Sequence, residues 1–328
     1  MVRVALDLMG GDKAPTEILE GAKLSSSKDV KILLIGTKQA LTKADGFDKV
    51  EVDDFLPMDV KPTEILRRKN SSMYVGLKLL NEKAVDVFVS AGNTGALLAG
   101  STFVLGRIEG VERPALGVPV PSIGGFTILI DAGANAHVRA EHLLDFAVMG
   151  FSYAKVLGRV KPRIGLLNVG EEETKGDETT RQAYILLKEN FPDSFVGNVE
   201  GHDINTGKVD VVVSDGFSGN VAMKTMEGTA KMILQTLKDK VNEAGLLQKI
   251  GALLMKKVFA ELKKTLDPRT YGGGLVLGVD GLVVKAHGSS DRFAISNAIK
   301  VACEGVKMGM IEGLRGEIQR VRDSGAYR

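Results

Sequence analysis

Residues 86–95 read Asp-Val-Phe-Val-Ser-Ala-Gly-Asn-Thr-Gly, a short apolar run that ends in a turn of small residues. The run has the length of a buried strand, and the turn leads directly into an expected helix over 94–105. A strand that passes through a glycine-containing turn into a helix is the basic unit of α/β proteins. This stretch therefore predicts one such unit.

The same pattern recurs along the chain. Other short apolar runs followed by Gly, Asn or Asp predict buried strands over 2–8, 30–35, 126–131, 163–168 and 209–214. Helices are expected over 15–24, 71–82, 140–157, 179–190, 219–244 and 291–312. This alternation favours a Rossmann-like α/β fold, in which helices flank a mainly parallel sheet, with residues 1–328 forming a single domain.

Composition limits the functions available to the chain. The 328 residues are 44% hydrophobic and carry 43 basic against 41 acidic side chains, which gives no global case for nucleic-acid binding. The amino terminus does not resemble a signal peptide and no run of about 18 apolar residues is present, so we expect a cytoplasmic protein without a membrane span. Cys303, the single cysteine, is expected to be a buried apolar side chain.

Polar clusters follow most of the predicted strands, where ligands of such sheets bind. The glycines of 7–12 let the backbone approach a ligand, and 92–94 opens a helix whose N–H groups suit a phosphate, although Asn93 or Thr94 as a simple helix cap is an equally good interpretation. The candidate phosphate- or substrate-binding residues are Asp7, Gly10, Gly11, Asp12, Gly92, Asn93, Thr94, Asp131, Asn135, His287, Ser289 and Ser290.

Two further residues are candidates for the chemical step. Lys175 lies between Gly170 and Gly176, and its ammonium suits a phosphate oxygen or a developing oxyanion. The alternative is a solvated lysine paired with the nearby acids. Asn220 can donate and accept hydrogen bonds, which suits the orientation of a phosphate or a carbonyl, but asparagine is equally common as a helix cap.

Several familiar motifs are missing from the sequence. The segment 170–176 ends Lys-Gly and carries three glutamates, so it is a poor site for ATP, and no Gly-x-Gly-x-x-Gly follows the first strand to bind a dinucleotide. Gly-x-Ser-x-Gly, His-Glu-x-x-His and paired Cys-x-x-Cys do not occur either. We therefore expect no cofactor and no metal. His137 and His142, which bracket a helix start, are expected to be structural.

Taken together and in order, the clusters resemble those of bacterial phosphate acyltransferases. The similar segments are 5–12, 90–95, 131–135, 171–176, 215–220 and 285–291. The resemblance implies transfer of a long acyl chain from acyl carrier protein to inorganic phosphate, giving the acyl phosphate used in bacterial phospholipid synthesis. It also implies a homodimer with a phosphotransacetylase-like fold that attaches peripherally to the inner face of the membrane. Lys175 and Asn220 match the family's proposed active-site lysine and asparagine.

The sequence departs from the family pattern at two places. Lys13 stands where the family often has histidine, so no general base is expected there. Residues 273–278 read Gly-Gly-Leu-Val-Leu-Gly instead of Gly-Ala-Pro-Leu-Leu-Gly, which leaves the preferred acyl length open.

The chemistry agrees with the resemblance. Phosphate is anionic near neutral pH, so its attack on a thioester needs positioning more than deprotonation and no protein nucleophile. We expect the backbone at 92–94 and 10–11 and the loop 287–290 to hold phosphate, while Lys175 and Asn220 orient it and stabilise the oxyanion.

Residues 246–264 are amphipathic at helical spacing, with five lysines against the single acid Glu261. This pattern suits a helix on anionic lipid, and the alternative is a helix packed on the core or on a dimer partner. The resemblance favours the membrane and predicts that 246–271 protrudes. The expected membrane contacts are Leu246, Leu247, Ile250, Leu253, Leu254, Val258 and Phe259.

Partners and alternative functions remain to be considered. Either this segment or the basic cluster at 67–69 has the charge to steer the acidic acyl carrier protein, and a membrane glycerol-3-phosphate acyltransferase is a further partner to test. A phosphotransacetylase that uses a coenzyme A thioester is the second enzyme hypothesis. A catalytically silent scaffold that binds a membrane or a carrier protein is the third.

Overall fold

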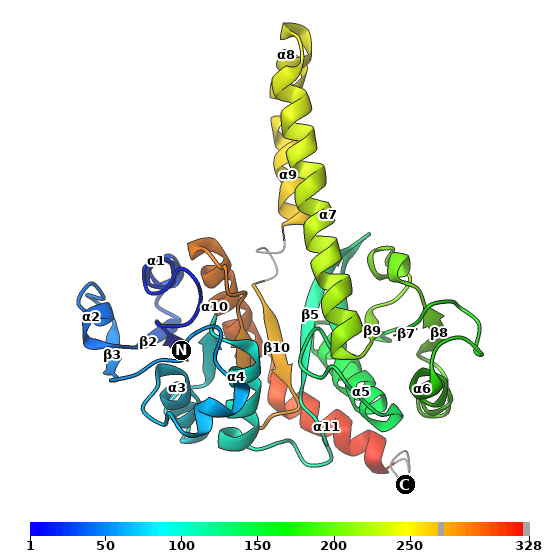
Figure 1. The fold of residues 1–328 in the computed structure, drawn as a ribbon, viewed down its shortest axis with the longest axis horizontal. Coiled ribbons are helices and arrows are strands. Elements are labelled where there is room, and N and C mark those ends of the chain that lie inside the picture. Colours follow the sequence, from blue (N-terminus) through cyan, green and yellow to red (C-terminus); the bar gives the residue numbers. More distant parts are fainter. Residues whose placement is uncertain (268–271, 324–328) are drawn as a thin grey trace.

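The computed structural model describes residues 1–267 and 272–323, which contain one 11-stranded sheet with the order β3-β2-β1-β4-β11-β10-β5-β6-β9-β7-β8. Figure 1 shows the two ends of this sheet as the left and right sides of the body. The strands are β1 (Val2–Asp7), β2 (Val30–Gly36), β3 (Asp48–Glu51), β4 (Val87–Ser90), β5 (Ala115–Ser122), β6 (Gly125–Ile130), β7 (Ile164–Leu167), β8 (Phe195–Val199), β9 (Val211–Val213), β10 (Gly274–Leu277) and β11 (Val283–Lys285).

Helices cover the sheet and connect its strands. The α-helices are α1 (Thr16–Ser25), α2 (Lys38–Leu41), α3 (Ser72–Asn81), α4 (Thr94–Gly100), α5 (Ala140–Val156), α6 (Glu178–Asn190), α7 (Gly216–Glu243), α8 (Leu246–Leu254), α9 (Lys256–Leu266), α10 (Arg292–Lys307) and α11 (Met310–Asp323). Three shorter helices are η1 (Pro62–Leu66), η2 (Ser101–Leu105) and η3 (Gly201–Asn205).

The central strands are buried on both faces, which explains their continuous apolar runs. In β4, Val87 and Val89 belong to the core cluster under α1 and α10, whereas Phe88 belongs to the cluster on the opposite face under α3 and α4. The alternation follows from the two-residue period of a strand. On the other side of the sheet, α5 covers one face and the first turns of α7 cover the other.

The strand directions place the polar strand ends near one another. Between the named strands of the described part of the chain, antiparallel pairing is confined to the pairs that involve β10 or β5, so the strands on either side run in opposite directions. The paired residues Leu6, Val89, Val284, Leu275, Gly117, Ile130 and Val213 form one row across the sheet. The residues that follow in the two sets of parallel strands are Asp7, Ser90, Lys285, Asp131 and Ser214. The parallel strands on both sides of β10 and β5 therefore have their carboxyl ends next to this row.

The predicted α/β fold is confirmed, with differences at the centre and at the carboxyl end. The six predicted strands are present, but β3, β5, β8, β10 and β11 were not expected, because they are short or interrupted by proline and glycine. The predicted helix over 291–312 is two helices. Gly309 has φ +65°, a left-handed conformation that ends α10 before α11 begins.

A long helical projection rises from the body. We call residues 230–266, the outer part of α7 with α8 and α9, the helical arm (Figure 1). The amphipathic segment is not one helix as its spacing suggested, because the backbone turns at Met255 and α9 returns beside α7. Residues 268–271 of the predicted protrusion lie outside the described residues. None of the helices in the described ranges has the length and apolar character needed to cross a membrane.

Candidate functional site

The loops after β1 and β4 are joined by a buried carboxylate. Asp7 accepts hydrogen bonds from Ser90 Oγ at 2.7 Å and from the Met9 amide at 3.1 Å, and Ser90 Oγ in turn accepts from the Gly92 amide at 3.0 Å. Burial raises the pKa of Asp7, while these hydrogen bonds act in the opposite direction. A Cβ atom on Gly10 would lie 2.6 Å from the Gly92 nitrogen, so only glycine fits in this turn.

The loop after β11 joins the same group. The Asp12 amide donates to the Gly288 carbonyl at 2.8 Å, and the Ala286 amide donates to the Ser90 carbonyl at 2.9 Å. The predicted segments 7–12, 90–94 and 287–290 thus come together. Asn93 is the N-cap of α4, because its side chain accepts from the Ala96 amide at 2.8 Å. This is the simpler of the two roles considered for that residue.

The loop after β6 is organised by a second buried carboxylate. Asp131 is fully buried, and its oxygens accept from the amides of Leu116, Gly133, Ala134 and Asn135 and from the Asn135 side chain. Burial raises the pKa of Asp131, and this network opposes the rise. Asp131 and Asn135 were predicted to bind substrate. In the structure they bind each other and shape their loop.

The first turns of α7 lie against this loop. The N-cap is Asp215, which accepts from the amides of Phe217 and Ser218, so Asn220 is not a helix cap. Asn220 is exposed and lies beside Gly133, where a Cβ atom would be 3.5 Å from the Asn220 Cβ. Within residues 1–267 and 272–323, no hydrogen-bond partner contacts the Asn220 amide. It remains available for a ligand.

Lys175 lies in the loop after β7, the strand beside β9. It is exposed, and the loop is held by a hydrogen bond from Asn168 Nδ2 to the Lys175 carbonyl at 3.1 Å. The alternative role, pairing with nearby acids, finds no support in the described ranges. Glu171 pairs with Lys208 at 2.6 Å and Glu173 with Lys188 at 2.8 Å, and the Lys175 ammonium has no ion pair with any described residue.

The two sets of loops meet between α7 and the loop after β11. Lys224, one turn beyond Asn220, places its Nζ 2.6 Å from His287 Nε2 and 2.9 Å from Glu227 Oε2. His287 Nδ1 lies 2.9 Å from Ser289 Oγ. Partial burial and then the Lys224 ammonium lower the pKa of His287. We call the loops after β1, β4, β6, β7 and β11, with the first turns of α7, the strand-end site.

Comparison with known proteins identifies the family. Residues 2–313 match the model of a family described as "Fatty acid synthesis protein". A phosphate acyltransferase of Pseudothermotoga lettingae is 76% identical over 328 residues, covering 100% of both chains, and one of Thermotoga maritima is 57% identical over 99% of each. The chain belongs to the phosphate acyltransferase family. It is therefore an acyltransferase.

Solved structures agree with this fold assignment for the acyltransferase. A phosphotransacetylase from Streptococcus pyogenes covers 93% of this chain with 94% of its own, at a TM-score of 0.62 and 14% identity. A branched-chain phosphotransacylase from Enterococcus faecalis covers 93% with 99% of its own, at a TM-score of 0.60 and 14% identity. At such identity the likeness concerns the fold, and the predicted phosphotransacetylase-like architecture is confirmed.

Two lysines of the acyltransferase were not among the predicted site residues. Lys285 is 7% exposed at the end of β11, and its ammonium donates to the carbonyls of Ala91, at 3.4 Å, and Ala286. Burial and then Lys224 lower the pKa of Lys285 to about 8. A lysine that ends a run of valines was a usable signal, because such a position is otherwise apolar. The signal for Lys224 was its helical spacing from Asn220.

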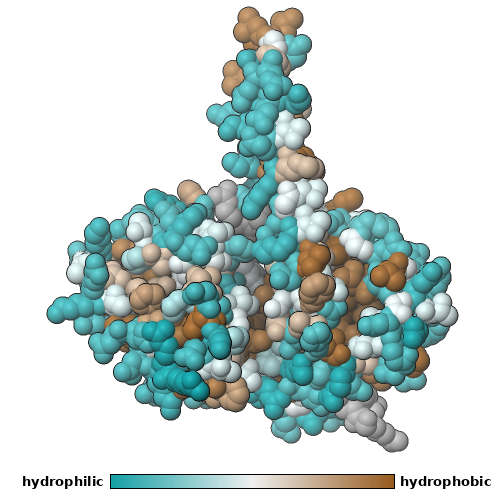
Figure 2. All heavy atoms as spheres, in the orientation of Figure 1, coloured by the Kyte–Doolittle hydropathy of each residue, from teal (hydrophilic) through white to brown (hydrophobic). Residues whose placement is uncertain are grey.

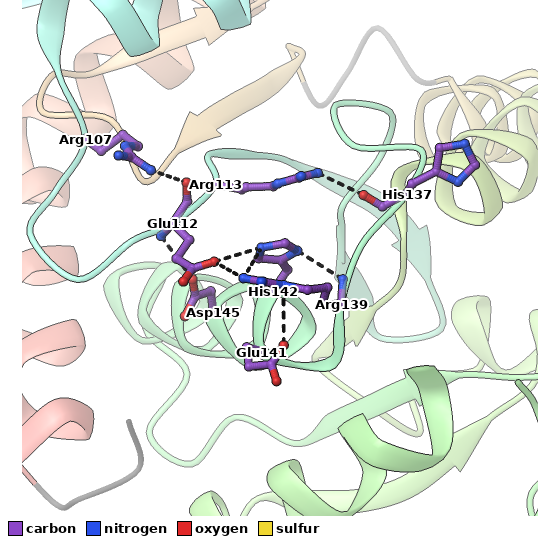
Figure 3. A network of polar contacts seen from close by, with 8 residues as sticks. All are labelled: Arg107, Glu112, Arg113, His137, Arg139, Glu141, His142 and Asp145. Carbon is purple, nitrogen blue, oxygen red and sulfur yellow. Dashed lines mark hydrogen bonds and ion pairs between the residues drawn. The ribbon is translucent and has the colours of Figure 1, made fainter. Parts of the chain in front are cut away.

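A separate polar network holds the start of α5 (Figure 3). The Arg139 amide donates to His142 Nδ1 at 3.0 Å, which leaves His142 Nε2 to donate to Glu112 at 3.0 Å. Burial lowers the pKa of the His142 side chain, and the Arg113 guanidinium donates to the His137 carbonyl at 2.9 Å. The expected structural role is confirmed for His142, whereas the His137 side chain is exposed and only the His137 backbone carbonyl takes part in the network. Cys303 is buried as well, as predicted.

Two cavities lie along the helical arm and not at the strand-end site. One of about 580 Å³ lies between α9 and α10, and one of about 600 Å³ lies among α7, α8 and α9. Phe259 lines the second cavity and is half-buried, whereas the other predicted membrane-contact residues are exposed. In the described ranges, no group of three His, Cys, Asp or Glu side chains is arranged to hold a metal ion.

Proposed function

We propose that this acyltransferase moves a long acyl chain from acyl carrier protein to inorganic phosphate and releases acyl phosphate. A phosphate oxygen attacks the thioester carbonyl, a C–O bond forms, and collapse of the tetrahedral intermediate breaks the C–S bond. The pantetheine thiolate leaves and takes a proton from water. Phosphate is the nucleophile in this scheme, so the protein needs no nucleophilic side chain. It needs cations and hydrogen-bond donors that position phosphate and stabilise the oxyanion.

The observation that carries the proposal is the set of unengaged polar groups at the strand-end site of a phosphate acyltransferase. The Lys175 ammonium and the Asn220 amide lack protein partners in the described residues. Lys175 lies in the loop after β7, and Asn220 lies in the first turns of α7, which follows the adjacent strand β9. We assign them to the orientation of phosphate and to the stabilisation of the oxyanion. The loops at 10–12, 92–94 and 287–290 surround the phosphate in this scheme.

The test is an assay with purified protein and palmitoyl acyl carrier protein, with and without inorganic phosphate, followed by mass spectrometry. Acyl phosphate that forms only with phosphate is the expected product. A folded protein that makes none from this donor contradicts the proposal. A catalytically silent scaffold predicts the same negative result with every donor.

A coenzyme A thioester is the second candidate donor. The observation in its favour is the fold, which is shared with phosphotransacetylases. The chemistry at the carbonyl is the same for both donors, so palmitoyl coenzyme A in the same assay separates them. If acyl phosphate forms from palmitoyl coenzyme A and not from palmitoyl acyl carrier protein, coenzyme A takes the place of the carrier protein in the proposed function.

We further propose that the enzyme is a cytoplasmic homodimer that attaches to the inner face of the membrane through its helical arm. The support is the exposure of Leu246, Leu247 and Leu254 at the tip, at 76%, 81% and 81%, beside several lysines. Membrane attachment would also bring the product close to a membrane glycerol-3-phosphate acyltransferase. Sedimentation with vesicles of phosphatidylglycerol tests the membrane contact, and light scattering in solution tests the dimer.

A further inference from the structure

Lys224 is the side chain through which α7 reaches the opposite half of the site. α7 begins at the end of β9, while His287 follows β11 on the other side of the antiparallel strands. Lys224 and Asn220 are four residues apart and therefore share one face of the helix. The contact of 2.6 Å between Lys224 Nζ and His287 Nε2 shows that this face looks toward the loop 287–290.

Positive charge accumulates at this contact. Lys285 lies below it, and no carboxylate in the described ranges is within ion-pair distance of its ammonium. The charged groups that act on His287 are Lys224, Glu227 and Lys231 from α7 and Lys285 from β11, and Asp12 and Asp7 act on Lys285. The Lys224 ammonium pairs with Glu227 at 2.9 Å and still lowers the pKa of Lys285, so a bound anion near both lysines would reduce their repulsion.

The same loop contains an unused donor. Ser290 is 4% exposed, and its hydroxyl oxygen has no hydrogen-bond partner among residues 1–267 and 272–323. Its amide donates to the His287 carbonyl at 3.0 Å, so the hydroxyl belongs to the turn that presents the imidazole. A buried hydroxyl without a partner is unfavourable, and an added acceptor would satisfy it.

We propose that Lys224 is a phosphate-contacting residue. A phosphate oxygen separates Lys224 Nζ from His287 Nε2 and accepts a hydrogen bond from both, and buried Lys285 at the end of β11 supplies further positive charge. His287 Nδ1 accepts from the Ser289 amide at 3.2 Å, so the proton of the neutral imidazole is on Nε2 and faces the Lys224 ammonium, a second donor. An ionised phosphate oxygen supplies the acceptor that these two donors lack. The identity of this anion, inorganic phosphate or the phosphoryl group of the product, rests on the proposed function.

The experiment titrates inorganic phosphate into the full-length protein and follows the His287 imidazole by NMR. Four histidines in the sequence make assignment practical, with His287→Gln to identify the signal. Lys224→Met removes the charge and keeps the chain length, and Lys224→Arg restores the charge. Lys240→Met is the matched control, because Lys240 is on the same helix and pairs with Glu243 at 2.9 Å, far along the arm.

Phosphate is expected to shift the His287 signal in the wild type and to raise the pKa of the imidazole, because a nearby anion favours its charged form. Lys224→Met is expected to weaken phosphate binding about tenfold or more, the usual effect of losing a charged hydrogen bond. Without phosphate, the same variant raises the pKa of His287, because the ammonium that lowers it is gone. Lys224→Arg recovers part of the affinity, and Lys240→Met behaves as the wild type.

Steady-state kinetics adds a second measurement. The KM for phosphate is expected to rise in Lys224→Met while the KM for palmitoyl acyl carrier protein stays constant. Equal phosphate affinity in folded Lys224→Met and wild type overturns the assignment, and so does a wild type that gives no phosphate response. If phosphate binds only when Lys224 is present but no acyl phosphate forms from any donor, the assignment stands and the proposed function fails.

Discussion

The strand-end site and the helical arm differ in which side chains they bury and which they expose. At the site, Asp7, Ser90 and Asp131 are polar and buried, and hydrogen bonds from the same chain satisfy them. On the arm, α8 and α9 contain no buried residue, and large apolar side chains gather at the tip (Figure 2). The buried polar groups of the site thus find their partners within the chain, whereas the apolar side chains of the arm are left exposed. Such an exposed apolar patch is typical of a contact with a membrane or another molecule.

The contrast explains which residues are free in each region. The unengaged groups at the site are polar, such as Lys175 and Asn220, and they suit an anion. The exposed side chains at the tip of the arm are largely apolar, and lysines such as Lys238, Lys249 and Lys256 line the cavity among its helices. The proposed chemistry and the proposed membrane attachment therefore lie at opposite ends of α7, which begins at the strand-end site and ends in the helical arm.

The largest expected effect is the loss of turnover on removing a free cation from the site. Lys175→Ala should lower kcat by about 10²–10³, because an oxyanion-stabilising donor contributes about that much. Lys161→Ala, which removes an exposed lysine outside the site, should leave kcat unchanged. Measurement of acyl phosphate formation decides the matter, with circular dichroism to check the fold. Near-normal turnover in folded Lys175→Ala removes Lys175 from the mechanism.

The second prediction concerns the buried network that shapes the site. Asp131→Ala leaves one buried and three partly buried backbone N–H groups without their acceptor, so the free energy of unfolding should fall by about 3 kcal/mol. Asp193→Ala, at an exposed position, should change it by less than about 0.5 kcal/mol. Urea denaturation measures both. A loss of activity in Asp131→Ala with full stability would mean that the carboxylate acts on substrate and not on its loop.

The third prediction tests the arm without touching the site. Leu254→Glu should weaken binding to phosphatidylglycerol vesicles about tenfold, because it removes an exposed apolar side chain available for insertion into lipid and adds a charge that the anionic surface repels. Ile185→Glu, an exposed apolar position on α6 at 57%, is the control. Turnover on the soluble donor should be equal in all three proteins. Unchanged vesicle binding of Leu254→Glu defeats the proposed membrane contact.

The smallest effect is a pH dependence at the boundary of the site. Lys285 is protonated below its pKa of about 8 and then attracts phosphate, and it loses this charge as the pH rises further. In the wild type, the kcat/KM for phosphate should therefore fall by roughly threefold above pH 8. In Lys285→Met, the kcat/KM for phosphate should be lower than in the wild type at pH 7 and should not change above pH 8. Parallel profiles of the two proteins exclude Lys285 as the titrating group.

The sequence predicted the strands whose apolar runs are unbroken. Val87–Ser90 and Val211–Val213 are buried on both faces, so every residue is apolar or small and the pattern is unambiguous. β5 carries Pro119 and Pro121, and β10 begins with glycine, so local propensity argued against them. These two strands reverse the direction of the sheet, and their pairing is decided by contacts far apart in the sequence.

For the candidate site as well, the sequence predicted some features and only long-range contacts decided the others. The glycines and small polar residues after each strand were recognisable, because their local chemistry fits a ligand site. The division of labour among them was not, since Asp131 and Asn220 look equally available in the sequence. Only burial and five donated hydrogen bonds distinguish the loop-forming Asp131 from the free Asn220.

The sequence by itself determined the α/β class, the order of the polar loops and the amphipathic character of residues 246–264, because each depends on neighbours within a few turns of chain. The tertiary structure decided that β5 and β10 bring the two sets of strand ends to one row, that Lys224 meets His287 across it, and that Lys285 is buried below. The physical reason is that burial and charge depend on packing between segments distant in sequence.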